Sequence, residues 1–371
     1  MLPNPQPYFA DLPDPRRQTR NKLHKLEDIV MITLCAVLGG YEDWVSIEDF
    51  GYENETWLRR FLELPNGIPS HDTLSDVIGR IDRDAFAQAF SGWVRAGLPE
   101  LAGRQVAIDG KSLRGSRGED GTVHVISAFA TQARLVLAAR AIPDKANEIT
   151  AIPGLLAQLN LAGAVVTIDA MGCQKNIAKA IIEQKADYVL ALKENHANLY
   201  DDVKLWLDDN DAEGYVRIHE TVEKNHGRIE TRRTAVSTKL DWLAQKKEWA
   251  GLQAVAMVES TREIGDKVSC ERRYYLCSIT DATRIAQTIR DHWAIENQQH
   301  WILDVQFGED SHRTRKNHSA ANLGIIRRTA LNLLQQDGAD KRSVRRRKMR
   351  AMSDLAYRES LLFKKSAVGN A

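Results

Sequence analysis

Short apolar runs alternate with helical patterns between Arg104 and Leu192, and this alternation constrains the fold more than any other feature of the sequence. Runs of alternating or continuous apolar residues are typical of strands, whereas apolar residues at 3.6-residue spacing are typical of helices. The resulting order, β-β-β-α-β-α-β-α, predicts an α/β fold in which helices cover a mixed sheet. The predicted strands are residues 105–108, 123–130, 135–142, 164–168 and 188–192.

The flanking regions have different patterns. The first hundred residues begin with a Pro-rich arm and continue with apolar residues at helical spacing, including a helix that we expect to start at the N-cap Ser70. The turn and short helix over residues 67–74 could form half of a helix-turn-helix, and packing explains them equally well. Residues 214–280 are mostly strand-like, and helical patterns return over residues 281–304 and 320–334.

These patterns predict three segments. A small all-α domain occupies residues 1–100, and an α/β domain with a β-rich insertion at about 214–280 occupies residues 101–336. A basic tail follows over residues 337–371. The longest apolar stretch, residues 29–38, is far shorter than the roughly 20 residues of a membrane span, and no targeting signal precedes it. We therefore expect a cytoplasmic protein, and the scattered cysteines Cys35, Cys173, Cys270 and Cys277 fit a reducing compartment.

Charge is unevenly distributed along the chain. The 371 residues carry a formal net charge of +1, yet residues 311–371 hold fifteen Lys or Arg against four Asp or Glu, a net charge of +11. A basic block of this kind favours binding to the phosphate backbone of a nucleic acid, although a solvated tail would have the same composition. The block is densest at Lys341, Arg342, Arg345, Arg346, Arg347, Lys348 and Arg350.

Two aspartates share a position in the pattern. Asp109 and Asp169 each come directly after a short apolar run that is rich in β-branched residues. Buried strands of a covered sheet deliver side chains at their carboxyl ends into a crevice, where a carboxylate is ready to bind a cation. Carboxylates without Cys or His favour hard cations such as Mg²⁺ over zinc. The pair therefore predicts a divalent-metal site.

A third carboxylate is expected on the helix over residues 289–304. Glu296, His300 and Asp304 are spaced i, i+4 and i+8, so they form one polar stripe. Both Glu296 and Asp304 are candidates on this ground. The triplet Gly110-Lys111-Ser112 is similar to the end of a phosphate-binding loop, but Gln105 occupies the position where that loop needs glycine.

Several of these motifs together resemble the ISAs-type, H-repeat-associated family of insertion-sequence transposases. The similarity covers nearly the whole chain, and residues 24–29 and 67–73 resemble that family's N-terminal associated domain. The remaining motifs are residues 107–111, 167–174, 226–232 and 292–297.

The resemblance implies a ribonuclease-H-like catalytic domain whose DDE triad falls on Asp109, Asp169 and Glu296, which selects Glu296 over Asp304. It also implies two Mg²⁺ ions, with Mn²⁺ able to substitute, that serve DNA cleavage and joining of the freed 3′-hydroxyl to target DNA. The expected partner is double-stranded DNA, bound by a homodimer at the element's terminal inverted repeats, so the protein would lie on the nucleoid when bound. The alternatives are an inactive relic that still binds DNA and a stand-alone nuclease of the same fold.

One departure concerns the residues around Glu296. The wider superfamily pattern Y-x₂-R-x₃-E-x₆-K falls on Ile289, His292 and Leu303, and none of them matches. DNA contacts must therefore come from other residues, for which Arg290 is one further possibility. Our candidates for DNA binding are Lys193, Arg228, Arg232, His292, Trp293, His300, Arg313, Arg315, Arg345, Arg346 and Arg347.

Overall fold

The computed structural model describes residues 2–18, 22–98, 100–118, 121–143, 148–209, 216–225, 227–338 and 340–363. The chain divides into two compact units. The first contains residues 1–100, 110–151 and 295–371, and the second contains residues 101–109 and 152–294. Within the described ranges, no helix is both long enough and apolar enough to cross a membrane.

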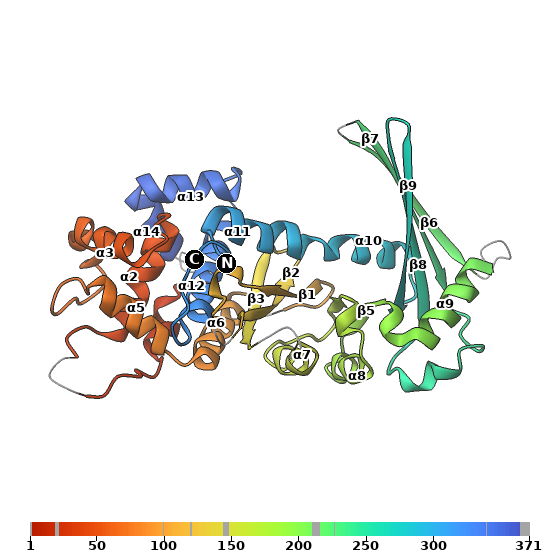
Figure 1. Ribbon diagram of the computed structural model, residues 1–371, viewed down its shortest axis with the longest axis horizontal. Helices are drawn as coiled ribbons and strands as arrows, with labels where there is room; N and C mark the ends of the chain where they lie inside the picture. The colour runs from red at the N-terminus through yellow and green to blue at the C-terminus, as the bar shows by residue number, and fades with distance from the viewer. Residues whose placement is uncertain are drawn as a thin grey trace, which may run out of the picture. The chain divides into compact units, whose positions relative to one another are not determined.

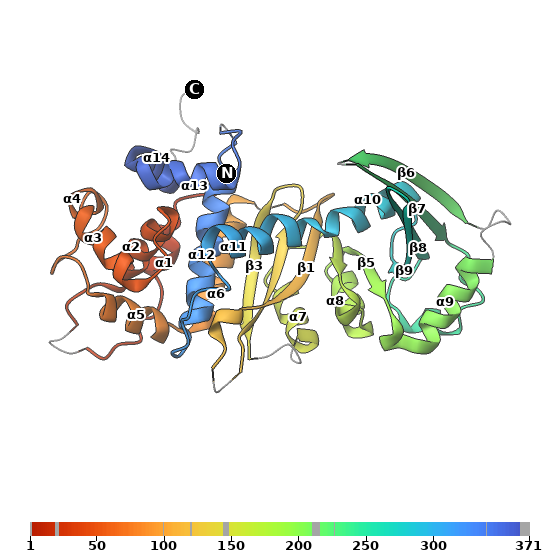
Figure 2. The ribbon, with the colours of Figure 1, turned by 45° about the horizontal axis from the view of Figure 1, so that its top comes forward.

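Helices make up most of the first unit, and the helical N-terminal region that the sequence predicts is confirmed. Helix α12 packs against α2, α5 and α6 (Figure 2). Ser70 is the N-cap of α5, because its hydroxyl accepts a hydrogen bond from the Thr73 amide. The helices of this part are α1 (Gln6–Ala10), α2 (Leu26–Leu38), α3 (Trp44–Glu53), α4 (Glu55–Leu58), α5 (His71–Arg80), α6 (Arg83–Gly97), α11 (Trp301–Phe307) and α12 (Ser319–Gln335).

The segment expected as a basic tail contains two further helices, α13 (Val344–Ser353) and α14 (Leu355–Leu362). Arg358 of α14 is buried, and its guanidinium group lies over the rings of Phe50 and Trp57, at 4.9 and 5.8 Å from the ring centroids. Because a cation over an aromatic ring is attracted to its face, this contact holds α14 on the N-terminal helices. Residues 364–371 of the expected tail lie outside the described residues.

A nine-stranded mixed sheet runs in the order β3-β2-β1-β4-β5-β9-β8-β7-β6. Strands β1, β4 and β5 are parallel, whereas β9, β8, β7 and β6 continue from β5 as antiparallel neighbours. The predicted strand and helix order and the mixed α/β class are confirmed. The strands are β1 (Gln105–Ser112), β2 (His124–Ala130), β3 (Leu135–Ile142), β4 (Val165–Ile168), β5 (Asp187–Leu192), β6 (Arg217–Asn225), β7 (Arg228–Ser237), β8 (Ala254–Ile264) and β9 (Lys267–Cys277).

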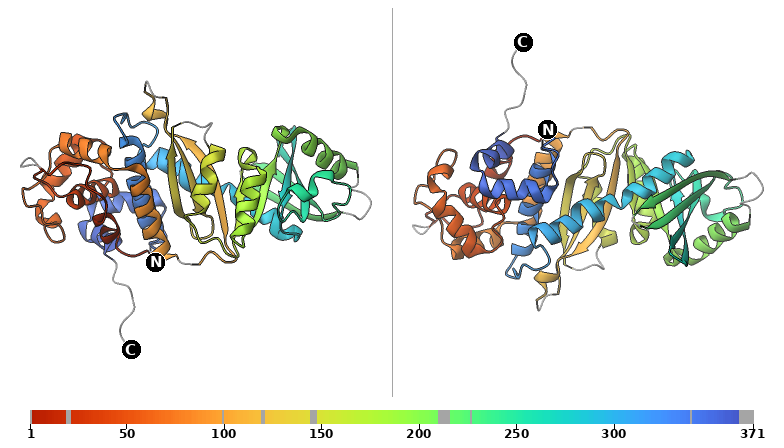
Figure 3. Two further views of the ribbon diagram at one scale, coloured as in Figure 1. Left: turned by 90° about the horizontal axis from the view of Figure 1, so that it is seen from below. Right: turned by 90° about the horizontal axis from the view of Figure 1, so that it is seen from above.

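Helices cover both faces of the sheet in the second unit. Figure 3 shows α8 (Lys175–Glu183) in front of the strands from below and α10 (Ala282–His292) in front of them from above. Ile285 and Ile289 of α10 pack against a cluster that includes Val165, Val189 and Cys277. This burial explains the apolar stripe of α10. The unit also contains α9 (Ala197–Asp209), and α7 (Glu148–Leu156) spans the boundary between the units.

The β-rich region expected at 214–280 forms the long ribbon of β6 to β9 (Figure 1). It extends the sheet, because β9 pairs with β5 from Val189↔Cys277 to Leu192↔Tyr274. The apolar runs of this region predict strands only over residues 252–258 and 274–279. Strand β8 continues to Ile264 and β9 begins at Lys267, because their outer halves are largely exposed and charged and lack an apolar pattern. The first strand of the region is expected to begin at Tyr215, which lies outside the described residues.

Candidate active site

Asp109 and Asp169 follow neighbouring positions of two parallel strands. Ile108 of β1 and Ile168 of β4 are paired in the register, so the two aspartates come next on adjacent strands. The expectation that Asp109 ends its strand is wrong, because β1 continues to Ser112. The other neighbour of β1 in the sheet is β2, so β1 can continue past the point where β4 ends.

The Asp169 carboxylate is tied to the turn that follows it. Its Oδ1 accepts hydrogen bonds from the amides of Met171 at 3.1 Å and Gly172 at 3.3 Å. A side chain on Gly172 would overlap Ile168, so only glycine fits this turn. The side-chain amide of Asn195 donates to the Ala170 carbonyl at 2.9 Å and holds the turn from outside. The turn thereby fixes the direction in which the carboxylate points.

Glu296 and His300 lie on a single π-helical turn, Glu296–His300, and not on the uninterrupted α-helix that the sequence predicts. His300 Nδ1 lies 2.9 Å from Glu296 Oε2. The side chain of His300 is 3% exposed and that of Glu296 is 53% exposed. The hydrogen bond from His300 lowers the pKa of Glu296; burial opposes this effect, and the positive charges of His300 and Lys111 add to it. Glu296 is therefore kept ionised, and π-helical turns are frequent at functional sites.

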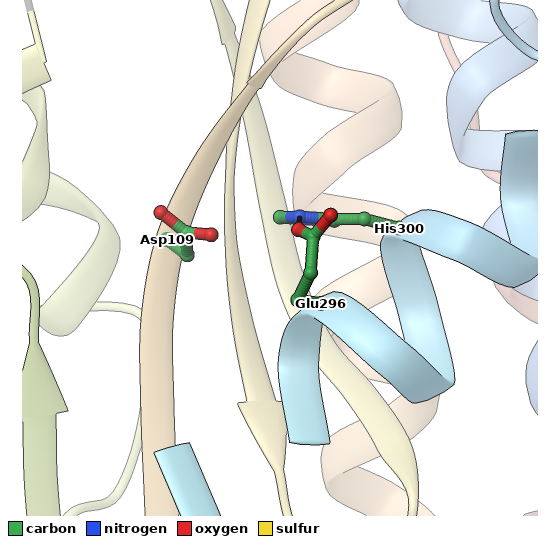
Figure 4. A group of neighbouring side chains, drawn as sticks. All are labelled: Asp109, Glu296 and His300. Carbon is green, nitrogen blue, oxygen red and sulfur yellow. Dashed lines mark hydrogen bonds and ion pairs between the residues drawn. The ribbon is translucent and has the colours of Figure 1, made fainter. Parts of the chain in front are cut away.

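Three side chains offer a set of metal ligands. One ligand atom each from Asp109, Glu296 and His300 lies within 4.8 Å of the others, and Figure 4 shows Glu296 and His300 extending from one helix toward the strand that carries Asp109. The two carboxylates fit Mg²⁺ or Mn²⁺, and an imidazole nitrogen adds a ligand that suits Mn²⁺ better than Mg²⁺. Asp169 is not part of this group, so its membership of the triad stays a prediction.

Asp304, the rival of Glu296, has another partner. Its Oδ1 lies 2.6 Å from the ammonium nitrogen of Lys111, a side chain that is 9% exposed. The pKa of Asp304 is raised by burial, an effect that Lys111 counteracts. In the sequence, Lys111 stands out only as part of a motif similar to a phosphate-binding loop. The contact between Lys111 and Asp304 was not predicted from the sequence. The alternating pattern of β1 was the available signal, since it puts Lys111 and Asp109 on one face of the strand.

The candidate DNA-binding residues of β7 take part in ion pairs within the sheet. Arg232 pairs with Glu230, and Arg228 Nη2 lies 3.5 Å from the same carboxylate. Arg232 also approaches Glu223 of β6 to 4.0 Å, and the register pairs Glu223 with Glu230. His226, which belongs to the motif that carried the resemblance here, lies outside the described residues. Because Arg228, Glu230 and Arg232 alternate along one strand, the sequence allows either a salt-bridge ladder or a DNA contact. The ion pairs fit the ladder, and DNA contact by these residues stays a prediction.

The candidates near Glu296 differ in exposure. His292 is half-buried, with Nδ1 2.9 Å from the Thr167 hydroxyl oxygen. Trp293 is 49% exposed and therefore does not lie in the core, and the Arg273 guanidinium lies 5.3 Å from its ring centroid. The remaining exposed candidates are Lys193, Arg313 and Arg315.

The basic block of α13 divides into two groups. Arg345 and Arg346 are exposed. Arg347 donates to the carbonyls of Leu334 at 2.6 Å and Gln335 at 3.3 Å at the end of α12, where the last helical carbonyls have no donor within the helix. Lys348 donates to the Gln306 carbonyl. Part of the basic block therefore has a structural role, and only its exposed part is available to a polyanion.

The fold and the acidic group together describe an α/β protein with a candidate metal site, and comparison with known proteins identifies the family. Residues 101–333 match the family described as "Transposase DDE domain", and residues 7–94 match the one described as "DDE_Tnp_1-associated". The chain belongs to the DDE transposase family, which confirms the resemblance seen in the sequence.

Individual proteins are similar to this chain over most of its length. The chain is 50% identical to an "Uncharacterized protein in dhlA 3'region" of Xanthobacter autotrophicus over 76% of this chain and 96% of that protein. It is 38% identical to the "H repeat-associated putative transposase YhhI" of Escherichia coli K12 over 96% of each chain. A solved structure, the piggyBac transposase synaptic complex with hairpin DNA, matches 94% of this chain and 75% of its own at 11% identity, with a TM-score of 0.44.

Proposed function

We propose that this protein is a DNA transposase that cuts the ends of an insertion sequence and joins the freed 3′-hydroxyl to target DNA. The observation that supports this most is the acidic group of Asp109, Glu296 and His300 in a chain of the DDE transposase family. In the first step a water oxygen attacks phosphorus at the element's end and the 3′-oxygen leaves. In the second step that 3′-hydroxyl attacks a phosphodiester of the target, and the target's own 3′-oxygen leaves.

Each residue would have a defined part in this chemistry. Asp109 and Glu296 would provide carboxylate ligands, and Asp169 would join them from the neighbouring strand. His300 would orient Glu296 through its hydrogen bond, as partners of metal ligands commonly do. When bound there, divalent cations supply Lewis-acid activation of the attacking and leaving oxygens in an in-line displacement. No covalent link between protein and DNA is required.

The DNA would be held by exposed basic side chains. Arg345 and Arg346 on α13 and Arg313 and Arg315 after α11 are exposed, unlike Arg347, which is half-buried and donates to the end of α12. Phosphate contacts by such residues give affinity that falls with salt concentration. We expect the protein to act in the cytoplasm on the nucleoid, as a homodimer that brings two inverted repeats together.

A strand-transfer assay tests the proposal. The purified chain is incubated with labelled DNA from the flanks of its gene, which should contain short inverted repeats, together with a target plasmid and Mg²⁺ or Mn²⁺. We expect cleaved and joined products, and we expect each of Asp109→Asn, Asp169→Asn and Glu296→Gln to lower cleavage at least 100-fold with DNA affinity kept. The matched control is Asp291→Asn, which changes a half-buried carboxylate of α10 that accepts a hydrogen bond from Gln287 and should leave cleavage unchanged.

The outcomes that would contradict the proposal can be told apart by their products. Cleavage without joined product would indicate a stand-alone nuclease, and DNA binding without cleavage would indicate a relic. Full activity of any one triad variant would exclude that residue from the site.

A further inference from the structure

Lys111 sits among three carboxylates within the first unit. Its ammonium nitrogen lies 2.6 Å from Asp304 Oδ1, 2.7 Å from Asp310 Oδ1 and 3.5 Å from Glu309 Oε2. The Lys111 side chain is only 9% exposed, so its ammonium group makes these three contacts largely shielded from water. Lys111 is therefore held in place by carboxylates on three sides.

The three acids belong to one connected piece of chain. Asp304 lies on α11, directly after the π-helical turn of Glu296 and His300. Glu309 and Asp310 follow α11, which ends at Gly308 with a positive φ of 58°. The Glu309 amide donates to the Leu303 carbonyl at 3.0 Å, so this loop folds back onto the helix. Lys111 thereby binds both the helix and the loop that ends it.

The loop is also held against the segment that follows Lys111. The Arg114 amide donates to Asp310 Oδ1 at 3.3 Å. A side chain on Gly115 would overlap the His312 carbonyl, so the two backbones approach as closely as glycine permits. Glu309 and Arg328 form an ion pair of 2.6 Å in which both side chains are fully buried. These contacts leave the loop little freedom, and Lys111 links it to β1.

The same arrangement fixes the direction of Glu296. Strand alternation puts Asp109 and Lys111 on one face of β1, and helical spacing puts Glu296, His300 and Asp304 on one stripe. The ion pair between Lys111 and Asp304 joins this face of β1 to the last residue of the polar stripe on the helix. A helix held at Asp304 cannot rotate about its axis without moving the carboxylate of Glu296.

We propose that Lys111 is a positioning residue, whose ion pair with Asp304 holds the helix of Glu296 and His300 in the orientation that binds a divalent cation. The inference rests on the proposed function, because it assigns Lys111 a part in the same metal site. Lys111 contributes by orienting the helix, so its removal should weaken metal binding even though it removes a positive charge.

The test is Mn²⁺ binding to the DNA-free full chain, measured by isothermal titration calorimetry. Removing a positive charge close to a cation site should strengthen Mn²⁺ binding if electrostatics alone matters. Loss of orientation should weaken it, and removal of a residue that orients metal ligands typically lowers affinity by roughly 10- to 100-fold. We expect Lys111→Met and Asp304→Asn each to weaken Mn²⁺ binding by this factor. Because both substitutions break the same ion pair, the double variant should bind Mn²⁺ at least as tightly as the single variant with the lower affinity.

A matched control separates this role from general loss of structure. Lys22 is another lysine of the same unit with a mostly covered side chain, 18% exposed, and its ion-pair partner at 2.9 Å is Asp14 and not a residue of α11. Lys22→Met should lower thermal stability while leaving Mn²⁺ affinity within about twofold of wild type. Unchanged or tighter Mn²⁺ binding by Lys111→Met would overturn the proposal, as would an additional bound Mn²⁺ with the original affinity retained.

Hydrogen exchange gives a second readout that does not depend on the metal. Amides of residues 296–307 should exchange at least tenfold faster in Lys111→Met than in wild type, with α6 as the internal reference. Equal exchange in both proteins would also overturn the proposal. If the wild-type chain binds no Mn²⁺, the proposed metal site fails and the exchange experiment alone decides the role of Lys111.

Discussion

The ion pair between Glu309 and Arg328 gives a sharp stability prediction. Both side chains are fully buried, and Arg328 Nη1 lies 2.6 Å from Glu309 Oε1 and 3.0 Å from the Gly324 carbonyl. Burial alone would raise the pKa of Glu309, but Arg328 and then Lys111 lower it below its ordinary value. The substitution Arg328→Met keeps most of the volume and removes the charge, so it isolates the electrostatic part of the pair.

The expected loss in the free energy of unfolding depends on the ion pairs that Glu309 keeps in Arg328→Met. Removing one partner of a buried pair costs about 3–5 kcal/mol, because the other charge is left without compensation. Glu309 still has Lys111 at 3.5 Å, so we expect the lower part of this range, about 3 kcal/mol. Adding Glu309→Gln removes the uncompensated charge, and the double variant should recover more than half of the lost free energy of unfolding.

Urea denaturation followed by circular dichroism at several pH values measures both effects. In wild type, Glu309 contributes stability above its unfolded-state pKa, and this contribution is lost as the pH falls through the lower folded-state pKa. In Arg328→Met, burial raises the pKa of Glu309, so protonation relieves the penalty at low pH. The difference between the two proteins should therefore be largest near pH 7 and shrink below about pH 5. A difference that stays constant or grows on acidification would refute this reasoning.

Further predictions concern a glycine beside the site and the basic helix. In Gly110→Ala the new Cβ would overlap His124 and lie 2.8 Å from Glu148 Oε1, so the free energy of unfolding should fall by roughly 1–3 kcal/mol. Gly92→Ala in α6, where a Cβ meets nothing within 4 Å, should instead raise it by roughly 0.5–1 kcal/mol, and equal effects in urea denaturation would contradict the packing argument. Changing Arg345 and Arg346 to Gln should reduce the salt dependence of DNA binding by about 0.9 in the log–log slope for each phosphate that is no longer neutralised, whereas Arg347→Gln should mainly lower stability. An unchanged slope would remove Arg345 and Arg346 from the DNA-binding surface.

The sequence predicted the elements whose pattern is local. The runs before Asp109 and Asp169 are apolar because they are buried strands, and the strand and helix order followed from them. The pairing of β9 with β5 could not be predicted, since register between distant strands depends on the whole sheet. The outer halves of β8 and β9 escaped detection because paired charges, such as Glu259 with Arg272, replace the apolar alternation there.

In the candidate site, too, the sequence predicted some features and only the folded structure shows others. Asp109 and Glu296 could be proposed from position and resemblance, and the structure brings both into one acidic group. The hydrogen bonds from the backbone to Asp169 depend on a turn of three residues that no periodicity reveals. The contact between Lys111 and Asp304 joins residues far apart in the chain, so only the folded structure could show it.

The π-helical turn at Glu296–His300 bears on how this helix can change. In a regular α-helix a residue and its i+8 neighbour differ in direction by about 80°, because each residue advances the helix by about 100°. A π turn closes over more residues and rotates less per residue, which brings Asp304 back toward the side of Glu296. Loss of a single residue from this turn would restore α-helical geometry with Asp304 seven residues after Glu296, so the two carboxylates would still differ in direction by only about 20°. The extra residue therefore lets an eight-residue spacing place both carboxylates on one side, where a regular α-helix needs seven.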